Sequence, residues 1–251
     1  MPRPPSLSLL QLLAATDAGA QLGRALAGRF QARIHDAYRV PRAGAALIVG
    51  NHGLFGLDSV VLTALLIAET GRTPRFLAER NLFRIPGARQ VLDAVGAIEG
   101  DPDDAVRLLE AGELVCVYPG GVDDSFKLSR EAYTLKWGAR AGFARVALRA
   151  RAPVVPIAAI GIDDLFEVPA REGLVGRLLL GSARYDLPLP ANLLPRRVPL
   201  DYHVLPLIET QEGDAADPAA VEGVRRATWE ALEQVLAGCR ERRAGVRERR
   251  G

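Results

Sequence analysis

Short runs of consecutive apolar residues alternate with longer amphipathic stretches along the central part of the chain. The strongest runs lie at residues 45–50, 113–118 and 153–160, and such runs are typical of strands buried on both faces of a sheet. Residues 75–78 predict another strand, and residues 202–208 predict an edge strand. Helices are expected between and after these strands, at residues 57–67, 101–109, 132–151 and 218–240.

This alternation predicts an α/β fold: a single domain with a mainly parallel or mixed central sheet flanked by helices, and helical segments at both termini. We divide the chain into an N-terminal helical segment at residues 1–36, an α/β domain at residues 37–240 and a basic tail at residues 241–251. Residues 6–36 carry an apolar stripe beside positive charges, so this segment is expected either to pack on the core or to lie in a membrane interface.

Composition and charge narrow the range of functions. Of 251 residues, 49% are hydrophobic, which suffices for a sizeable core, and the net charge of +2 gives no overall field that would attract nucleic acid. The cysteines, Cys116 and Cys239, are spaced for neither a metal site nor a disulfide framework, so a reducing cytoplasm is expected. Lysine occurs only at Lys127 and Lys136, and this bias toward Arg is typical of a GC-rich, and here we expect bacterial, genome.

No apolar run approaches the length of about 20 residues that a membrane-spanning helix needs. We therefore expect a cytoplasmic protein that does not cross a bilayer and associates peripherally with the inner face of the cell membrane. The candidate contacts are the apolar face of residues 6–30 and the Leu-rich segment at residues 178–180.

His52 is the residue that points most directly to chemistry. Asn51 and His52 follow the apolar run at residues 45–50, and ligands bind at the carboxyl ends of strands in α/β sheets. A neutral imidazole accepts a hydroxyl proton at neutral pH, and a carboxylate on its other nitrogen fixes the tautomer and stabilises the imidazolium. Asp58 is the nearest candidate for that carboxylate, although the helix dipole also favours an acid in a first helical turn.

Further motifs follow His52 and Asp58 in a recognisable order. They are Ala78–Gly87, then Tyr118-Pro119-Gly120-Gly121, then Val154-Val155-Pro156-Ile157. Together these motifs resemble the glycerolipid acyltransferase (PlsC-like) superfamily, whose members carry His-x4-Asp, Phe-Pro-Glu-Gly-Thr-Arg and Val-Pro-Val-type motifs. The resemblance covers roughly residues 40–165. It implies catalysis by His52 and Asp58 and substrate contacts from Asn51, Tyr118, Pro119, Gly120 and Gly121.

Departures from the family pattern bear on the acceptor. Five residues separate His52 from Asp58, Gly120 replaces the usual Glu, and Asp123 replaces the usual Arg. The Arg that commonly closes the second block is also missing, and such Arg residues are thought to hold an acceptor phosphate. The Asn-His-x5-Asp and Pro-Gly-Gly pattern, with Tyr133–Phe143, is similar to the branch of the phytyl ester synthase/diacylglycerol acyltransferase and transmembrane-protein-68-like proteins. An uncharged lipid alcohol is therefore the expected acceptor.

The resemblance implies transfer of an acyl group from acyl-CoA or acyl carrier protein, as co-substrate, to a lipid hydroxyl. No serine occupies a Gly-x-Ser-x-Gly turn, so direct attack by the acceptor is the simpler mechanism, and neither a metal nor a bound cofactor is expected. The amides that begin the helix at residue 57 are candidates for holding the oxyanion. Three alternatives stay open: a lysophosphatidate acyltransferase with a basic cluster drawn from Arg80, Arg84 or Arg140, a non-catalytic lipid-binding protein, and a thioesterase.

Overall fold

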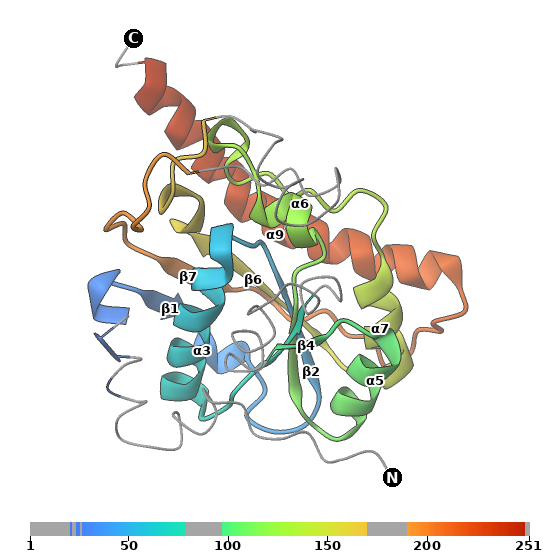
Figure 1. The fold of residues 1–251 in the computed structure, drawn as a ribbon. Coiled ribbons are helices and arrows are strands. Elements are labelled where there is room, and N and C mark those ends of the chain that lie inside the picture. The colour runs from blue at the N-terminus through green and yellow to red at the C-terminus, as the bar shows by residue number, and fades with distance from the viewer. Residues whose placement is uncertain (1–20, 22–23, 26, 79–96, 170–189, 249–251) are drawn as a thin grey trace.

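A single mixed sheet organises the computed structural model, which describes residues 21, 24–25, 27–78, 97–169 and 190–248 (Figure 1). The strand order is β1-β7-β6-β2-β5-β3-β4. The strands are β1 (Arg33–His35), β2 (Ala46–Gly50), β3 (Arg75–Ala78), β4 (Ala97–Glu99), β5 (Leu114–Val117), β6 (Val154–Ile160) and β7 (Asp201–Val204). Because β6 and β7 pair antiparallel and all other neighbours pair parallel, β1 and β7 run opposite to the other five strands.

Helices cover both faces of the sheet (Figure 1). Helix α3 (Leu57–Thr70) covers one face, and α5 (Pro102–Glu110), α7 (Gly142–Ala150) and α9 (Pro218–Glu248) cover the other. The alternation of side chains along β2 explains why the strand is entirely apolar: Ile48 packs into the core beneath α3, whereas Leu47 and Val49 pack into the core on the opposite face. The predicted α/β fold is therefore confirmed.

Most of the predicted elements form where the apolar pattern places them. The strands expected at residues 45–50, 75–78, 113–118 and 153–160 are β2, β3, β5 and β6. Helix α5 begins as expected, with Pro102 as its first residue and the Asp101 carboxylate accepting a hydrogen bond of 2.8 Å from the Asp103 amide. The remaining elements are the short helix α6 (Gly121–Ser125) and 3-10 turns at residues 37–39, 54–56, 129–131 and 162–164.

The expected helix over residues 6–36 is wrong at its end. Residues 1–20 lie outside the described residues, and Arg33–His35 form β1 instead of a helical turn. The reason is tertiary, because the Arg33 amide donates to the Leu200 carbonyl at 2.9 Å and β1 continues this pairing along β7. Residues 178–180, the other predicted membrane contact, also lie outside the described part of the chain.

The helix predicted over residues 132–151 is wrong in its first half, because only Gly142–Ala150 is helical. Tyr133 and Gly138 both have positive φ, which breaks a helix, and the side chains of Tyr133, Leu135 and Trp137 are buried. Core packing of these side chains thus overrides the helical pattern.

The C-terminal elements also differ from the predictions. Strand β7 is not an edge strand, because β1 pairs along its outer side. Helix α9 continues beyond Arg240 to Glu248, so the described part of the predicted basic tail is helical, and the guanidinium of Arg243 pairs with Asp164. No described helix combines the length and apolar character that crossing a membrane requires.

Asn51 extends the pairing of β2 with β6 beyond the last residue of β2. Its side chain is 1% exposed, its Nδ2 donates to the Ala159 carbonyl at 2.9 Å, and its Oδ1 accepts from the Ala159 amide at 2.8 Å. An amide side chain therefore satisfies both polar groups of a buried β6 residue at the point where β2 leaves the sheet.

We expect Asn51→Ala to lower the free energy of unfolding by about 1–3 kcal/mol, because both Ala159 groups lose a partner inside the protein. Urea denaturation measures the loss. Thr63→Val is the control: the Thr63 hydroxyl bonds only to the Ser59 carbonyl of its own helix, so its removal should cost less than about 1 kcal/mol. Equal losses in the two variants would contradict the role given to Asn51.

Candidate active site

His52 lies at the carboxyl end of β2, where the chain turns toward α3. The 3-10 turn Leu54–Gly56 includes two consecutive residues with positive φ, Phe55 at 62° and Gly56 at 67°. This left-handed turn brings the first turn of α3 back toward His52. The chain therefore accommodates five residues between His52 and Asp58, one more than the motif that the sequence resembles.

His52 and Asp58 form a hydrogen-bonded pair. Nδ1 of His52 lies 3.0 Å from Oδ2 of Asp58, and the two side chains are 18% and 2% exposed. A carboxylate at Nδ1 assigns the ring proton to that nitrogen and leaves Nε2 as the proton acceptor. Nε2 makes no hydrogen bond to the described part of the chain. The structure thus brings together the predicted base and its predicted partner.

Tyr118 fixes the plane of the His52 ring. The two rings stack with centroids 4.1 Å apart and planes 9° apart, and the Ser59 hydroxyl donates to the Tyr118 oxygen at 3.1 Å. Burial raises the pKa of Tyr118 well above its ordinary value, so the phenol remains neutral through the physiological range. The ring of His52 is therefore held by Asp58 at one nitrogen and by Tyr118 on one face.

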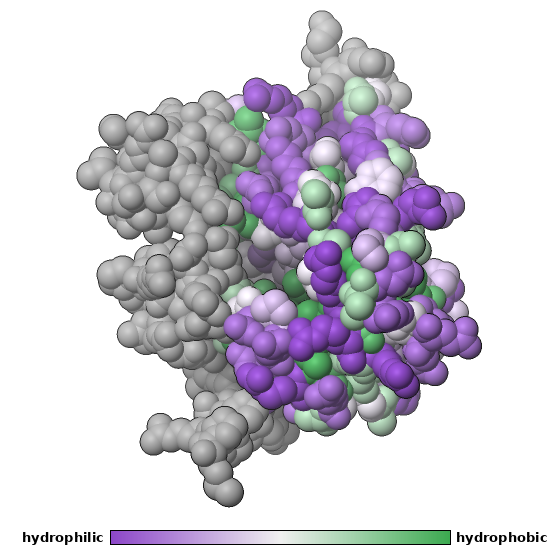
Figure 2. Space-filling model, turned by 90° about the vertical axis from the view of Figure 1, so that its right-hand side faces the viewer, coloured by the Kyte–Doolittle hydropathy of each residue, from purple (hydrophilic) through white to green (hydrophobic). Residues whose placement is uncertain are grey.

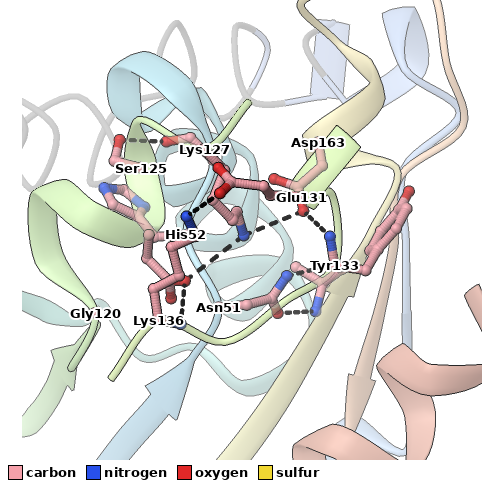
Figure 3. Close-up of polar contacts among 12 residues, drawn as sticks. Asn51, His52, Gly120, Ser125, Lys127, Glu131, Tyr133, Lys136 and Asp163 are labelled. Atoms are coloured by element: carbon pink, nitrogen blue, oxygen red, sulfur yellow. Dashed lines mark hydrogen bonds and ion pairs between the residues drawn. The ribbon is translucent and has the colours of Figure 1, made fainter. Parts of the chain in front are cut away.

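A cluster of buried charges lies beside His52 (Figure 3). Nζ of Lys127 lies 3.2 Å from Oδ2 of Asp163 and 3.7 Å from Oδ1 of Asp124, and none of the three side chains is more than 7% exposed. The amides of Tyr133 and Lys136 donate to Asp163 and Asp124 at 2.6 and 3.0 Å. Despite these acids, no set of three or more His, Cys, Asp or Glu side chains in the described residues is arranged to hold a metal ion.

The other predicted substrate-binding residues differ in burial. Pro119 and Gly120 are buried, whereas Gly121 is partly exposed. The Ser125 hydroxyl of α6 donates to the Gly53 carbonyl at 2.8 Å, which ties this loop to the turn after His52. Asn51 is fully used by the β6 backbone, so its place in the structure is that of a sheet residue.

The sequence interpretation missed Asp124, Lys127 and Asp163 as parts of one cluster. Asp163 and Asp124 resemble solvated loop acids, because charged residues near turns are usually exposed. One signal was available in Lys127: a chain with 32 Lys and Arg residues uses Lys at only two positions, and both lie between β5 and α7.

The protein-family model described as Acyltransferase matches residues 31–160, which contain β2, the His52–Asp58 pair, the Tyr118–Gly121 loop and β6. The chain belongs to the Acyltransferase family. The family predicted from the motifs is therefore confirmed.

Relatives of this family member include proteins from animals and mycobacteria. The chain is 36% identical over 133 residues to a cattle protein named "DGAT1/2-independent enzyme synthesizing storage lipids", an alignment that covers 53% of this chain and 40% of that protein. It is 30% identical over 229 residues to an uncharacterized protein of Mycobacterium tuberculosis, covering 84% of this chain and 63% of the relative. The chain thus spans about two fifths of the length of the animal relative.

The fold of this family member is shared with a solved acyltransferase. The crystal structure of the 1-acyl-sn-glycerophosphate acyltransferase PlsC from Thermotoga maritima superposes with a TM-score of 0.54 at 13% sequence identity. The match covers 92% of this chain and 86% of the other. At that identity the likeness establishes the fold alone.

Gly120, where related proteins usually have Glu, is explained by its neighbour Asp124. A Cβ atom at Gly120 would lie 2.4 Å from both Cβ and Cγ of Asp124, although the φ of Gly120 is an ordinary −69°. Space rather than backbone conformation thus excludes a side chain at this position.

We expect Gly120→Ala to displace Asp124 and to lower the free energy of unfolding by about 1–3 kcal/mol, the usual cost of overpacking. Thermal or urea unfolding measures the change. Gly142→Ala is the control, because a Cβ there meets no atom within 4 Å, and it should leave stability within about 1 kcal/mol. A Gly120→Ala protein as stable as the wild type would contradict the close packing of Asp124.

Proposed function

We propose that this protein is a lipid O-acyltransferase in which Nε2 of His52 is the general base. The observation that carries the proposal is the His52–Asp58 pair at the carboxyl end of β2, within a chain of the Acyltransferase family. Asp58 is anchored through its backbone as well, because Tyr202 donates from its hydroxyl to the Asp58 carbonyl at 2.9 Å. The base and its partner are thus fixed before substrate arrives.

The proposed reaction is a direct acyl transfer. Nε2 takes the proton of the acceptor hydroxyl while the hydroxyl oxygen attacks the carbonyl carbon of an acyl thioester, from acyl-CoA or acyl carrier protein. The tetrahedral intermediate then collapses, the carbon–sulfur bond breaks, and the thiolate takes the proton from the imidazolium. Asp58 stabilises that imidazolium in between, and such a base contributes about 10²- to 10⁴-fold to the rate.

The N-terminus of α3 is where we propose that the oxyanion is held. Gly56, at this N-terminus, lies next to the base, since a Cβ there would be 3.7 Å from Cε1 of His52. No side chain caps this end of α3, so its first amides are available to a developing negative charge.

The charges around His52 favour an uncharged acceptor. Asp124 and Asp163 are buried nearby with one cation, Lys127, between them, and Asp123 lies on α6, which begins directly after Gly120. Of the Arg residues that a phosphate would require, Arg80 and Arg84 lie outside the described residues. Arg140 pairs with Asp123 and donates to the carbonyls of Gly120 and Lys136. A mono- or diacylglycerol or a long-chain alcohol fits these surroundings better than lysophosphatidate. The name of the cattle relative, an enzyme synthesizing storage lipids, also supports an uncharged acceptor.

We expect purified protein with palmitoyl-CoA to acylate dioctanoylglycerol or hexadecanol at least about tenfold faster than lysophosphatidate, because the three buried carboxylates, Asp58, Asp124 and Asp163, outnumber the buried Lys127 and repel a phosphate. Labelled product resolved by chromatography measures the rates, and His52→Ala should lower them about 10²-fold or more. A product with lysophosphatidate alone would overturn the neutral acceptor. Hydrolysis that no alcohol accelerates would show a thioesterase, and turnover unchanged in His52→Ala would overturn the proposed base.

Exposed apolar side chains near His52 support contact with a membrane surface. Phe55 is 65% exposed and meets the buried Phe166 edge-on, at 5.3 Å between ring centroids. Leu193 and Leu194 are 90% and 76% exposed, and the preceding Asn192 holds their loop to the same segment by accepting from the Glu167 amide at 2.7 Å. By contrast, the side of the molecule in Figure 2 is mostly hydrophilic over the described residues, with apolar residues scattered on it.

We expect the double variant Leu193→Ser, Leu194→Ser to bind vesicles of phosphatidylcholine and phosphatidylglycerol roughly tenfold more weakly in a flotation assay, because two apolar side chains no longer enter the interface. Tyr38→Ser is the control. Tyr38 is 74% exposed, but it follows β1 and so lies at the end of the sheet opposite to His52. Equal binding of both variants would contradict this orientation on the membrane.

A further inference from the structure

Lys127 is a buried cation in a chain that has Lys at only one other position, Lys136, and otherwise uses Arg for positive charge. Its side chain is 3% exposed, and it faces Asp163 at 3.2 Å and Asp124 at 3.7 Å. An ammonium is compact, whereas a guanidinium is planar and wider, so a small buried space between two carboxylates suits Lys. The departure from Arg at this position is therefore explained by the geometry of the cluster.

Three buried polar atoms in this region have no hydrogen-bond partner. They are Oδ1 of Asp58, Oδ2 of Asp124 and Nζ of Lys127, out of five such side-chain atoms among the described residues. Nζ makes ion pairs but no well-directed hydrogen bond, so charge attraction holds Lys127 to the two acids. Unpaired polar atoms are costly in a protein interior, and their concentration beside a base is typical of a functional site.

Asp124 lies on α6, and the hydroxyl of the next residue, Ser125, holds this helix to the Gly53 carbonyl, directly after His52, at 2.8 Å. Burial raises the pKa of Asp124, and the charge of Lys127 is the largest influence that opposes this rise, while His52 acts in the same direction as Lys127. Burial works against the charge of Lys127, but Asp163 and Asp124 outweigh it and raise the pKa of Lys127. Asp58 and Tyr118 thus contact His52 directly, whereas Asp124 lies on the helix that is held to the residue after His52.

We propose that Asp124 is a second carboxylate of the active site and that Lys127 is the buried counter-ion that keeps it charged. Asp124 stabilises the imidazolium that forms on His52, and Gly120 leaves the space in which Asp124 reaches this place. Asp124 and Lys127 are positioning residues, because they act through His52 and not on substrate. The inference rests on the proposed function for its catalytic half, whereas the coupling of Lys127 to Asp124 stands on its own.

The sign of the pH dependence follows from Asp124. A carboxyl group whose pKa is raised in the folded protein favours folding at low pH, and this contribution is lost as the pH rises through the folded pKa. Without Lys127 the pKa of Asp124 rises further. The charged carboxylate therefore lowers the free energy of unfolding more at neutral and alkaline pH. Lys127→Met should therefore destabilise the protein more at pH 8 than at pH 5.5.

The test compares wild type, Lys127→Met, Asp124→Asn and the double variant of these two substitutions. We expect Lys127→Met to lower Tm by roughly 10 °C at pH 8 and by clearly less at pH 5.5. In the Asp124→Asn background the same substitution should show a weaker dependence on pH. Lys136→Met is the matched control, because it removes the same charge from the same segment at a partly exposed pair with Glu131, and its effect should not change with pH.

The catalytic half is read from kinetics with the acceptor that wild type uses. We expect Asp124→Asn to lower kcat about tenfold with KM within about twofold, because the field of Asp124 acts on the imidazolium and not on bound substrate. Lys127→Met should lose activity at a higher pH than wild type on the acid side, and the double variant should match Asp124→Asn.

Asp163 also loses its partner in Lys127→Met, so an equally pH-dependent loss in the Asp124→Asn background would assign the effect to Asp163 and overturn the coupling to Asp124. A loss of Tm in Lys127→Met that is equal at both pH values would overturn the counter-ion role, and an unchanged kcat in Asp124→Asn would overturn the role of Asp124. If the double variant alone folds, its Tm against that of Asp124→Asn still gives the pH dependence of removing Lys127. Absence of turnover in wild type would reject the proposed function, while the unfolding experiment would still decide the Lys127–Asp124 coupling.

Discussion

Burial of three carboxylates at the carboxyl end of the sheet is the constraint on which the candidate site depends. Asp58, Asp124 and Asp163 come from three different segments, and each would be repelled by the others if they were left uncompensated in the interior. Lys127 supplies one positive charge between two of them, and His52 contacts the third. Backbone amides of Tyr133 and Lys136 add to the compensation by donating to Asp163 and Asp124.

This requirement shapes the loops around the site. The segment at residues 132–141 is not helical, because its amides donate to the acids and its aromatic side chains pack into the core. The absence of a side chain at Gly120 leaves the space in which Asp124 packs against the loop after β5. The side-chain amide of Asn51 bonds to the backbone of Ala159 in β6. These two hydrogen bonds fix the ends of β2 and β6 next to His52. The His52 ring is therefore held by the packing of several elements rather than by Asp58 alone.

The central strands and the His52–Asp58 pair were accessible to sequence reasoning because both are local. An apolar run such as residues 45–50 is typical of a strand that is buried on both faces of a parallel sheet. His52, two residues after this run, must therefore lie at the carboxyl end of a strand. Asp58 was accessible for the same reason, since a short turn separates it from His52. The edge position expected for residues 202–208 failed because β1, distant in sequence, pairs along β7.

The sequence by itself determined the layered α/β fold, the membership of the Acyltransferase family and the proximity of His52 to Asp58. These features depend on residue pattern over short stretches of chain. Only the tertiary structure decided that Tyr118 stacks on His52, that Asn51 belongs to the sheet, and that Asp124, Lys127 and Asp163 share one buried site. Such contacts depend on how separate segments pack together, and hydrophobic periodicity carries no information about which polar side chains will meet.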